Sequence, residues 1–354
     1  MRACIFTLLL CVFCLNAFAD EAWQPVGGIK ESDIKEVVVK DGVVYASSEK
    51  SLYRGDDNGE TWKAVFTARG DSNGINSIGI SEQGVFACTD NGVFKSSDGI
   101  SSWKRIFKCI GAEKNSTRYI AFNNNKIFLG TRAGLFISSD NGITWQKSSS
   151  ETGSISIKWI TFLDEAVFLA TEKGVYKGSG TNWKRVFITF TEETEYDADA
   201  IDEAAAASEP VNSIFVKDKT IYLATDSGVF ISEDAGESWQ RFESAGLGSE
   251  KINRLIVLDS QTQYSSSAVE KDTVSARSND ILFAATDSGV FVIDVNDNAW
   301  QALYKGMDAD RINSIAADNK GGIWVATDKG LYKSSPLTLS LSPEGRGNNI
   351  LELF

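Results

Sequence analysis

The sequence predicts an all-β protein, a seven-bladed β-propeller whose blades are four-stranded antiparallel sheets. A hairpin pattern, apolar-Ala-Thr-Asp-x-Gly-Val-Phe in its fullest form, recurs seven times in 354 residues. A Trp follows most copies at intervals near the length of a four-stranded blade, which is about 40 residues. Within each interval apolar residues alternate with period two between Gly, Asn and Asp turns, as in short strands joined by hairpins.

The seven hairpins each contain an apolar strand, a tight turn and a second apolar strand. They are residues 45–53, 86–94, 128–136, 168–176, 222–230, 283–291 and 324–332. The first six are followed by Trp62, Trp103, Trp145, Trp183, Trp239 and Trp300. In each turn we expect the Asp to bond the turn backbone and the Gly to supply a positive φ. One strand before the hairpin and one around the Trp complete each blade.

The two ends of the repeat complement one another. The seventh copy lacks a Trp strand, whereas the stretch from Trp23 to Val26 resembles a Trp strand without its three predecessors. We predict that residues 22–26 form the outer strand of the last blade. The propeller then spans residues 20–335, and its closure leaves no free sheet edge between the first and last blades.

The first residues have the features of a secretory signal peptide. Arg2 precedes an apolar run too short to span a bilayer, and Ala17-Phe18-Ala19 forms a small-x-small cleavage site. We predict that residues 1–19 are removed after Ala19 and that the product is periplasmic or secreted.

Three segments depart from the repeat. Residues 189–210 contain eight carboxylates and fall between blades four and five, on the face where the innermost strands begin. Residues 259–280 are Ser-rich and fall on the opposite face. Residues 336–354 form a non-propeller tail, although residues 337–342 could alternatively be a strand that competes with residues 22–26 for the last blade.

Composition excludes several classes of chemistry. The chain contains no His, so Ser-His-Asp triads and His-ligated metal centres are excluded, and we expect neither a cofactor nor a metal site. Without Arg2 the chain carries 34 Lys and Arg against 48 Asp and Glu, a formal charge of −14. Such an acidic protein repels nucleic acid and anionic lipid. We expect a monomer that neither binds nucleic acid nor inserts into a membrane.

Cys88 and Cys109 remain after removal of the signal peptide. In an oxidising compartment they could pair, but the repeat places Cys88 inside a buried strand with another strand between the two. The alternative is that both act as small apolar residues.

Two stretches match the pattern Ser-x-Asp-x-Gly-x-Thr/Ser-Trp in full. They are Ser138, Asp140, Gly142, Thr144 and Trp145, and Ser232, Asp234, Gly236, Ser238 and Trp239. The stretches ending at Trp62 and Trp103 match in part, with Gly55 in the Ser position and Ile100 in the Gly position. These stretches resemble the BNR, or Asp-box, repeat of sialidases, some glucanases, sortilin-type receptors and photosystem II assembly factors.

The resemblance implies an architectural role for the box residues. In those families the box is a turn between the third and fourth strands, on the face opposite the usual active site. Asp57, Asp98, Asp140 and Asp234 are therefore expected to bond turn N–H groups, and Trp62, Trp103, Trp145 and Trp239 to pack between blades.

The sequence gives little support for an enzyme. The Phe-Arg-Ile-Pro motif of sialidases is absent, and no spacing among the 48 acids singles out the facing carboxylates that a glycosidase needs. We expect no catalytic residues. The stretch at 322–332 also resembles the sensor propellers of two-component regulators.

A ring of polar residues is the candidate binding site. Alignment of the innermost strands places four amides and three cations at one equivalent position near the channel mouth: Lys35, Asn76, Arg118, Lys158, Asn212, Asn253 and Asn313. Such a ring could bind an anionic or hydroxyl-rich group or a peptide carboxylate. Alternatively, the Asn side chains bridge the backbones of neighbouring blades and the cations are solvated.

Hairpin-turn acids on the same face would surround this ring with negative charge and favour a basic or neutral partner. They are Glu49, Asp90, Glu172, Asp226, Asp287 and Asp328. We predict an exported, non-enzymatic scaffold that binds a protein partner of the cell envelope or exterior through its mouth-face loops. The alternative is a glycan-binding or glycoside-hydrolysing protein with BNR repeats.

Overall fold

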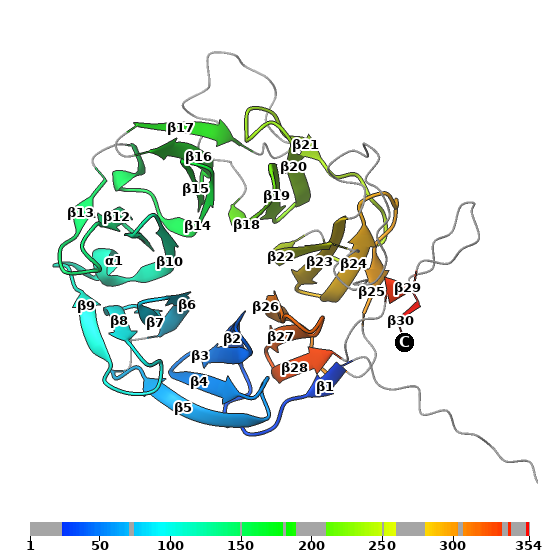
Figure 1. The fold of residues 1–354 in the computed structure, drawn as a ribbon. Helices are drawn as coiled ribbons and strands as arrows, with labels where there is room; N and C mark the ends of the chain where they lie inside the picture. The colour runs from blue at the N-terminus through cyan, green and yellow to red at the C-terminus, as the bar shows by residue number, and fades with distance from the viewer. Residues whose placement is uncertain are drawn as a thin grey trace, which may run out of the picture.

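In the computed structural model, seven four-stranded antiparallel sheets stand radially around a common axis (Figure 1), and we call the region between their inner strands the channel. The structure describes residues 23–70, 74–148, 151–179, 182–188, 210–249, 251–259, 280–303, 307–334, 339–340 and 352–353. Each blade runs from an inner strand at the channel to an outer strand at the rim. The predicted seven-bladed propeller is confirmed. The signal peptide, most of residues 189–210 and 259–280, and most of the tail lie outside the described residues.

The blades follow one another along the chain. Blade 1 contains β2 (Ile34–Lys40), β3 (Val43–Ser48), β4 (Ser51–Asp56) and β5 (Thr61–Thr67). Blade 2 contains β6 (Ile75–Ser81), β7 (Gly84–Thr89), β8 (Gly92–Ser96) and β9 (Lys104–Phe107). Blade 3 contains β10 (Thr117–Asn123), β11 (Lys126–Thr131), β12 (Gly134–Ser138) and β13 (Gln146–Lys147), after a short helix α1 (Ala112–Asn115). Blade 4 contains β14 (Ile157–Leu163), β15 (Ala166–Thr171), β16 (Gly174–Ser179) and β17 (Asn182–Phe187), after a 3-10 turn at Glu151–Gly153.

The remaining blades have the same order. Blade 5 contains β18 (Val211–Lys217), β19 (Thr220–Thr225), β20 (Gly228–Ser232) and β21 (Gln240–Arg241). Blade 6 contains β22 (Ile252–Asp259), β23 (Asp280–Thr286), β24 (Gly289–Asp294) and β25 (Gln301–Ala302). Blade 7 contains β26 (Ile312–Ala317), β27 (Ile323–Thr327) and β28 (Gly330–Ser334), and its outer strand is β1 (Trp23–Pro25).

The N-terminal strand closes the ring as predicted. β1 pairs with β28 in the register Trp23 to Ser334 and Pro25 to Tyr332. The Trp23 indole is buried and donates from Nε1 to the carbonyl of Leu303 in blade 6, at 2.9 Å. In the tail, β29 (Leu339–Ser340) pairs with β30 (Glu352–Leu353) in a separate two-stranded sheet, so this stretch does not occupy the last blade.

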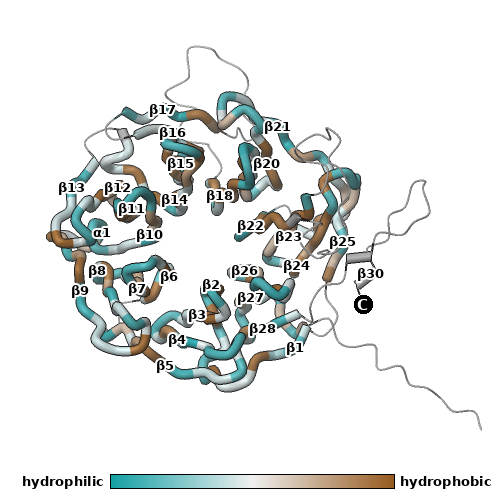
Figure 2. Tube along the Cα trace, in the orientation of Figure 1, coloured by the Kyte–Doolittle hydropathy of each residue, from teal (hydrophilic) through white to brown (hydrophobic). Residues whose placement is uncertain are grey.

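The hydrophobic core lies between neighbouring blades. Phe86 and Cys88 of blade 2, for example, pack with Ile120 and Leu129 of blade 3. Along the chain, hydrophobic stretches within the strands alternate with hydrophilic turns (Figure 2). Cys88 and Cys109 are free thiols, and burial raises the pKa of Cys88. Cys88 therefore serves as a small apolar residue of the core.

The outer-strand Trp residues join each blade to the preceding one. The Trp145 ring lies edge-on to Phe107 of blade 2, with centroids 5.2 Å apart, and Trp239 contacts Phe187 of blade 4 at 5.3 Å. Trp62 similarly contacts Trp324 of blade 7. Aromatic pairs of this geometry stabilise a contact beyond the contribution of the apolar area that they bury, so each Trp stabilises a blade interface.

The turns before Trp145 and Trp239 are held by an Asp and a Ser. The Asp140 carboxylate accepts from the N–H of Thr144 at 2.8 Å, and Ser138 Oγ accepts from the N–H of Gly142 at 2.8 Å. Asp234 and Ser232 bond the N–H groups of Ser238 and Gly236 in the same way. Hydrogen bonds to the ionised form lower the pKa of Asp140 and of Asp234 to about 2.

In the corresponding turn of blade 2 the Asp bonds a hydroxyl residue three positions ahead, whereas in blade 3 it bonds one four positions ahead. The carboxylate of Asp98 accepts from the N–H groups of Ile100 and Ser101 and from the hydroxyl of Ser101. Ser101 therefore takes the part that Thr144 takes in blade 3. Gly99 supplies the positive φ of 64° in this turn.

The turn of blade 1 is built from backbone instead. The N–H groups of Gly59 and Glu60 donate to the carbonyl of Asp56, and among the described residues the Asp57 carboxylate makes no hydrogen bond. Gly55 stands where the other turns have Ser, because a Cβ there would lie 2.8 Å from the Trp62 ring. The expectation that Asp57 bonds this turn is therefore wrong.

Replacement of Trp23 tests the closure. Trp23→Ala removes the buried indole and its bond to blade 6, so we expect the free energy of unfolding to fall by about 3–5 kcal/mol. Gln24→Ala, an exposed change in the same strand, is the control and should have little effect. Chemical denaturation measures both, and equal stability of the two variants would contradict closure by β1.

Candidate functional site: the polar mouth of the channel

The seven predicted ring residues occupy one structural position. Each is the second residue of its innermost strand, and in every blade the register with the next strand shifts between the first and third residues. Such a shift is a β-bulge, which re-aims the side chains beside it. The inner strands begin on the same face as the hairpin turns that precede the third strands, and we call this face the mouth.

The four ring amides bridge neighbouring blades. The Nδ2 of Asn76 donates to the carbonyl of Thr117 in blade 3 at 2.9 Å and to Asp90 at 3.0 Å. Three further residues make the same pair of bonds, each to the first residue of the next inner strand and to an Asp: Asn212 to Ile252 and Asp226, Asn253 to Ile312 and Asp287, and Asn313 to Ile34 and Asp33. Both N–H bonds of each amide are thus used within the fold. The oxygens of Asn212 and Asn313 accept from Lys158 and Arg311, so among the described residues only the oxygens of Asn76 and Asn253 are left for a ligand.

The hairpin turns are bonded by Thr rather than by Asp. Thr89 Oγ1 donates to the carbonyl of Gly92 at 2.8 Å and accepts from the N–H of Asn91 at 3.0 Å. Thr131, Thr171, Thr225, Thr286 and Thr327 do the same in blades 3 to 7, and Ser48 takes this place in blade 1. Asp90, Asp226 and Asp287 are therefore available to the ring amides, which differs from the turn bonding expected for them.

The three ring cations differ in how they are compensated. Lys35 forms an ion pair with Asp33 at 2.6 Å, whereas Lys158 donates only to Asn212 Oδ1 at 3.3 Å. Arg118 is half-buried and makes no hydrogen bond or ion pair within the described part of the chain. Burial and the nearby Arg132 lower the pKa of Arg118, and burial together with Arg118 and Lys251 lowers that of Lys158.

A cavity of about 350 Å³ opens at the mouth beside blades 5, 6, 7 and 1. Its lining comprises four ring residues and three others: Lys35, Asn212, Asn253 and Asn313, with Lys251, Asp287 and Arg311. Asp287 accepts from Asn253 at 2.8 Å and from Lys251 at 2.9 Å. Although burial opposes it, these bonds lower the pKa of Asp287, so this carboxylate is ionised and compensated.

Lys251 and Arg311 line the cavity but were not among the residues predicted from the sequence. Each stands two residues before a ring residue, just outside the inner strand, and the aligned positions in other blades include Asp33, Gly74 and Pro210. A search of the position two residues before each ring residue would have found them.

A layer of side chains beneath the ring crosses the channel. Arg254 of blade 6 donates to Glu36 of blade 1 at 3.1 Å, and its guanidinium lies 4.6 Å from the centre of the Trp159 ring in blade 4. Trp159 in turn stacks on Tyr119 of blade 3 with centroids 4.1 Å apart. Blades 1, 4 and 6 are not neighbours, so these contacts exist only across the channel. We call these four residues the channel brace.

The brace position also bonds the inner strands to each other. Glu36 accepts from the N–H of Ile78 in blade 2 at 2.6 Å, Ser314 from Val37 in blade 1 and Ser213 from Leu255 in blade 6. The inner edge of each blade has no neighbouring strand, so its N–H groups need such partners. This layer was not evident from the sequence, because the seven aligned positions combine three Ser with Glu36, Tyr119, Trp159 and Arg254.

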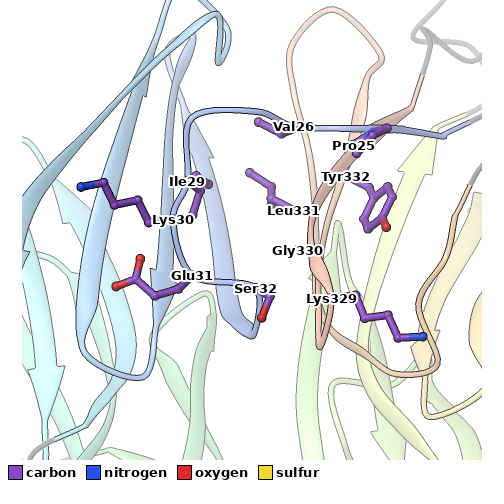
Figure 3. Close-up of a pocket in the computed structure, with 10 residues that line it drawn as sticks. All are labelled: Pro25, Val26, Ile29, Lys30, Glu31, Ser32, Lys329, Gly330, Leu331 and Tyr332. Carbon is purple, nitrogen blue, oxygen red and sulfur yellow. The ribbon is translucent and has the colours of Figure 1, made fainter.

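A second cavity lies at the closure seam, between blade 7 and the segment that leads from β1 to β2 (Figure 3). It measures about 180 Å³, and Val26, Ile29 and Leu331 form part of its wall. Its charged groups turn away: Glu31 accepts from Ser51 at 2.7 Å, and Lys329 pairs with Asp310 at 3.1 Å. This cavity is smaller and lacks converging polar groups, so the mouth is the better candidate.

The described residues form neither a metal cluster nor a membrane-spanning helix. Within the described ranges, no three His, Cys, Asp or Glu residues come together as a metal site would require. No helix in the same part of the chain is both long enough and apolar enough to span a membrane.

Comparisons with known proteins find a common fold. No curated protein matches the chain. A family model described as a two component regulator propeller matches residues 306–329, in and before blade 7. The extracellular domain of BT4673 from B. thetaiotaomicron, named as a hybrid two component system, has a TM-score of 0.67 at 16% identity over 91% of this chain. This chain spans only 40% of that structure.

Two other solved propellers are similar. YCF48 bound to D1 peptide has a TM-score of 0.59 at 15% identity, covering 90% of this chain and 98% of that one. An ancestral GH74 enzyme has a TM-score of 0.59 at 19% identity, covering 89% and 46%. The likeness is one of fold. These propellers belong to proteins of different kinds, so the fold alone does not select among their functions.

The channel brace predicts a strong dependence on Arg254. Arg254→Met leaves Glu36 buried without its counter-ion, and we expect it to lower the free energy of unfolding by about 3–5 kcal/mol at neutral pH. Burial already raises the pKa of Glu36 against the opposing effect of Arg254. The variant should therefore lose stability as pH rises through the raised pKa of Glu36 in the folded state, because its folded form binds the proton more tightly.

Controls separate the brace from an ordinary ion pair. The double variant Glu36→Gln/Arg254→Met should be less destabilised than the sum of the two single changes. Lys177→Met breaks an exposed pair with Glu237 and should cost less than about 1 kcal/mol. Additive effects of Glu36→Gln and Arg254→Met in denaturant titrations would contradict the cross-channel contact.

Proposed function

We propose that this chain is a non-enzymatic binding scaffold that holds a protein partner at the mouth of its propeller. The observation that carries this proposal is the mouth cavity of about 350 Å³, whose rim combines cations with amide oxygens. Its one lining carboxylate, Asp287, is ionised and bonded to Asn253 and Lys251. An ionised, compensated acid is a poor proton donor, which favours binding over glycoside hydrolysis.

The rigidity of the mouth supports the same role. Asn bridges and the channel brace join the inner strands of the blades, so a ligand meets a preorganised surface and little ordering is needed on binding. Among the similar folds, one is the extracellular domain of BT4673 and another, YCF48, is bound to a D1 peptide. We propose by analogy that this chain is exported by its signal peptide and binds a peptide segment in the envelope or outside the cell.

The electrostatics of the mouth favour an acidic contact group on the partner. Of the six turn acids that suggested a basic partner, Asp90, Asp226 and Asp287 accept hydrogen bonds from ring amides, so these oxygens are occupied within the fold although their charge remains. The cations Arg118 and Lys158 have no such carboxylate partner among the described residues. An acidic segment would supply it.

Charge reversal at the cavity tests the proposal. The mature chain, carrying an affinity tag, is used to capture partners from envelope extract, in parallel with Lys251→Glu/Arg311→Glu. Because these cations line the cavity, we expect the variant to lose at least tenfold of the captured partner. Lys104→Glu/Arg105→Glu reverses two exposed cations on the outer strand β9 and serves as the control.

The outcomes are distinct. Capture by the wild type and by the β9 control, but not by the cavity variant, supports the scaffold. Equal capture by all three, or no specific capture by the wild type, contradicts it. Turnover of aryl glycosides by the wild type, lost in Asp287→Asn, would favour the glycoside-hydrolysing alternative.

A further inference from the structure

The Arg118 side chain is the least compensated charge at the mouth. It projects from the second residue of β10, is half-buried, and makes no hydrogen bond or ion pair within the described ranges. Cations removed from water are ordinarily paired, since an unpaired buried charge is destabilising. A partner for Arg118 is therefore missing from the described fold.

Charges of both signs act on this corner. Burial lowers the pKa of Lys158, Asp226 and Glu172 oppose this shift, and Arg118 and Lys251 add to it. Arg132 lies close enough to Arg118, and Lys251 close enough to Lys158, to lower the pKa of each. Arg118 and Lys158 also oppose each other's charge. Clustered cations of this kind weaken a fold unless an anion joins them, so they are more readily explained by a ligand than by stability.

The nearest acids do not fill this need. Asp90 raises the pKa of Arg118 but lies beyond ion-pair distance, and its oxygens accept from Asn76, Ser116 and Gly74. Asp226 similarly accepts from Asn212 at 2.7 Å. Glu113 also acts on Arg118 without forming an ion pair.

We propose that Arg118 and Lys158 bind a carboxylate of the partner segment. This inference rests on the proposed function and names the chemical group recognised there. A guanidinium presents paired N–H donors that match the two oxygens of a carboxylate, and the neighbouring ammonium adds a second positive contact. A singly charged group is favoured over a phosphate or sulfate because the acidic side chains of Asp90 and Asp226 lie beside the site and repel a dianion more strongly.

Four short peptides test the inference on the mature chain. They are acetyl-Ala-Ala-Ala-Ala-Ala-Glu and the same peptide ending in Gln, each with a free and with an amidated C-terminus. Nε–Hε signals of arginine-labelled protein are followed by NMR, and Arg118 is assigned by the signal lost in Arg118→Gln. We expect peptides with at least one carboxylate to shift the Arg118 signal, and the amidated Gln peptide to leave it unchanged.

The pattern identifies the source of the carboxylate. Binding that needs the free terminus assigns the site to a chain end, and binding that needs Glu assigns it to a side chain. Arg118→Gln/Lys158→Gln should weaken binding at least tenfold, whereas Lys104→Gln/Arg105→Gln on β9 should not. The amide dispersion of both variants confirms that they fold.

Three results would overturn the inference: no carboxylate peptide binds, the amidated Gln peptide binds equally well, or inorganic sulfate displaces every peptide at lower concentration. The partner capture described above separates this failure from that of the scaffold. If Arg118→Gln/Lys158→Gln retains the partner and Lys251→Glu/Arg311→Glu loses it, the scaffold stands and the carboxylate site does not.

Discussion

A β-bulge at the second residue of each inner strand is the constraint on which the mouth depends. It occurs in all seven blades, and it re-aims two successive side chains. The first of them reaches a carbonyl of the following inner strand, as Asn76 reaches Thr117. The second reaches the N–H of the fourth residue of the following inner strand, as Glu36 reaches Ile78. Without the bulge, strict alternation would aim one of these side chains at the preceding blade.

This geometry addresses a problem peculiar to propellers. The inner strand of a blade has a free edge at the channel, where N–H and C=O groups would otherwise depend on water. Side chains from the preceding blade bond those groups and at the same time join neighbouring blades. The brace from Glu36 through Arg254 to Trp159 and Tyr119 adds contacts between blades that are not neighbours. The side-chain hydrogen bonds that satisfy the inner edges therefore also hold the blades together at the mouth.

Much of the fold could be predicted because it is repeated. Seven hairpins in register determine the number of blades, and the Trp23 stretch fits the one strand that the seventh copy lacks. The positions of Lys35, Asn76 and their equivalents followed from alignment of the inner strands. Irregular features were harder to predict: the blade 1 turn lacks its Asp bond because Trp62 packs on Gly55, which displaces the Ser that the turn would need.

The chemistry of the site was predicted less well than its position. Asn and cations share the ring position, yet the amides donate both N–H bonds within the fold, whereas Arg118 donates none among the described residues. Alignment cannot distinguish these roles, because they depend on whether an Asp and a carbonyl lie within reach. The brace was missed because Glu36, Tyr119, Trp159 and Arg254 occupy one position with four unlike side chains, and the contacts of Arg254 with Glu36 and Trp159 exist only across the channel.

The ring therefore contains amides that stabilise the fold and two cations, Arg118 and Lys158, that do not. The most direct measurement compares the free energy of unfolding of Asn212→Ala with that of Arg118→Gln/Lys158→Gln in the absence of any ligand. Loss of the amide leaves the carbonyl of Ile252 and the carboxylate of Asp226 short of a donor and should cost about 1–3 kcal/mol. Removal of the two cations should leave stability unchanged or increase it. A double variant less stable than Asn212→Ala would contradict this division, because the two cations would then stabilise the fold.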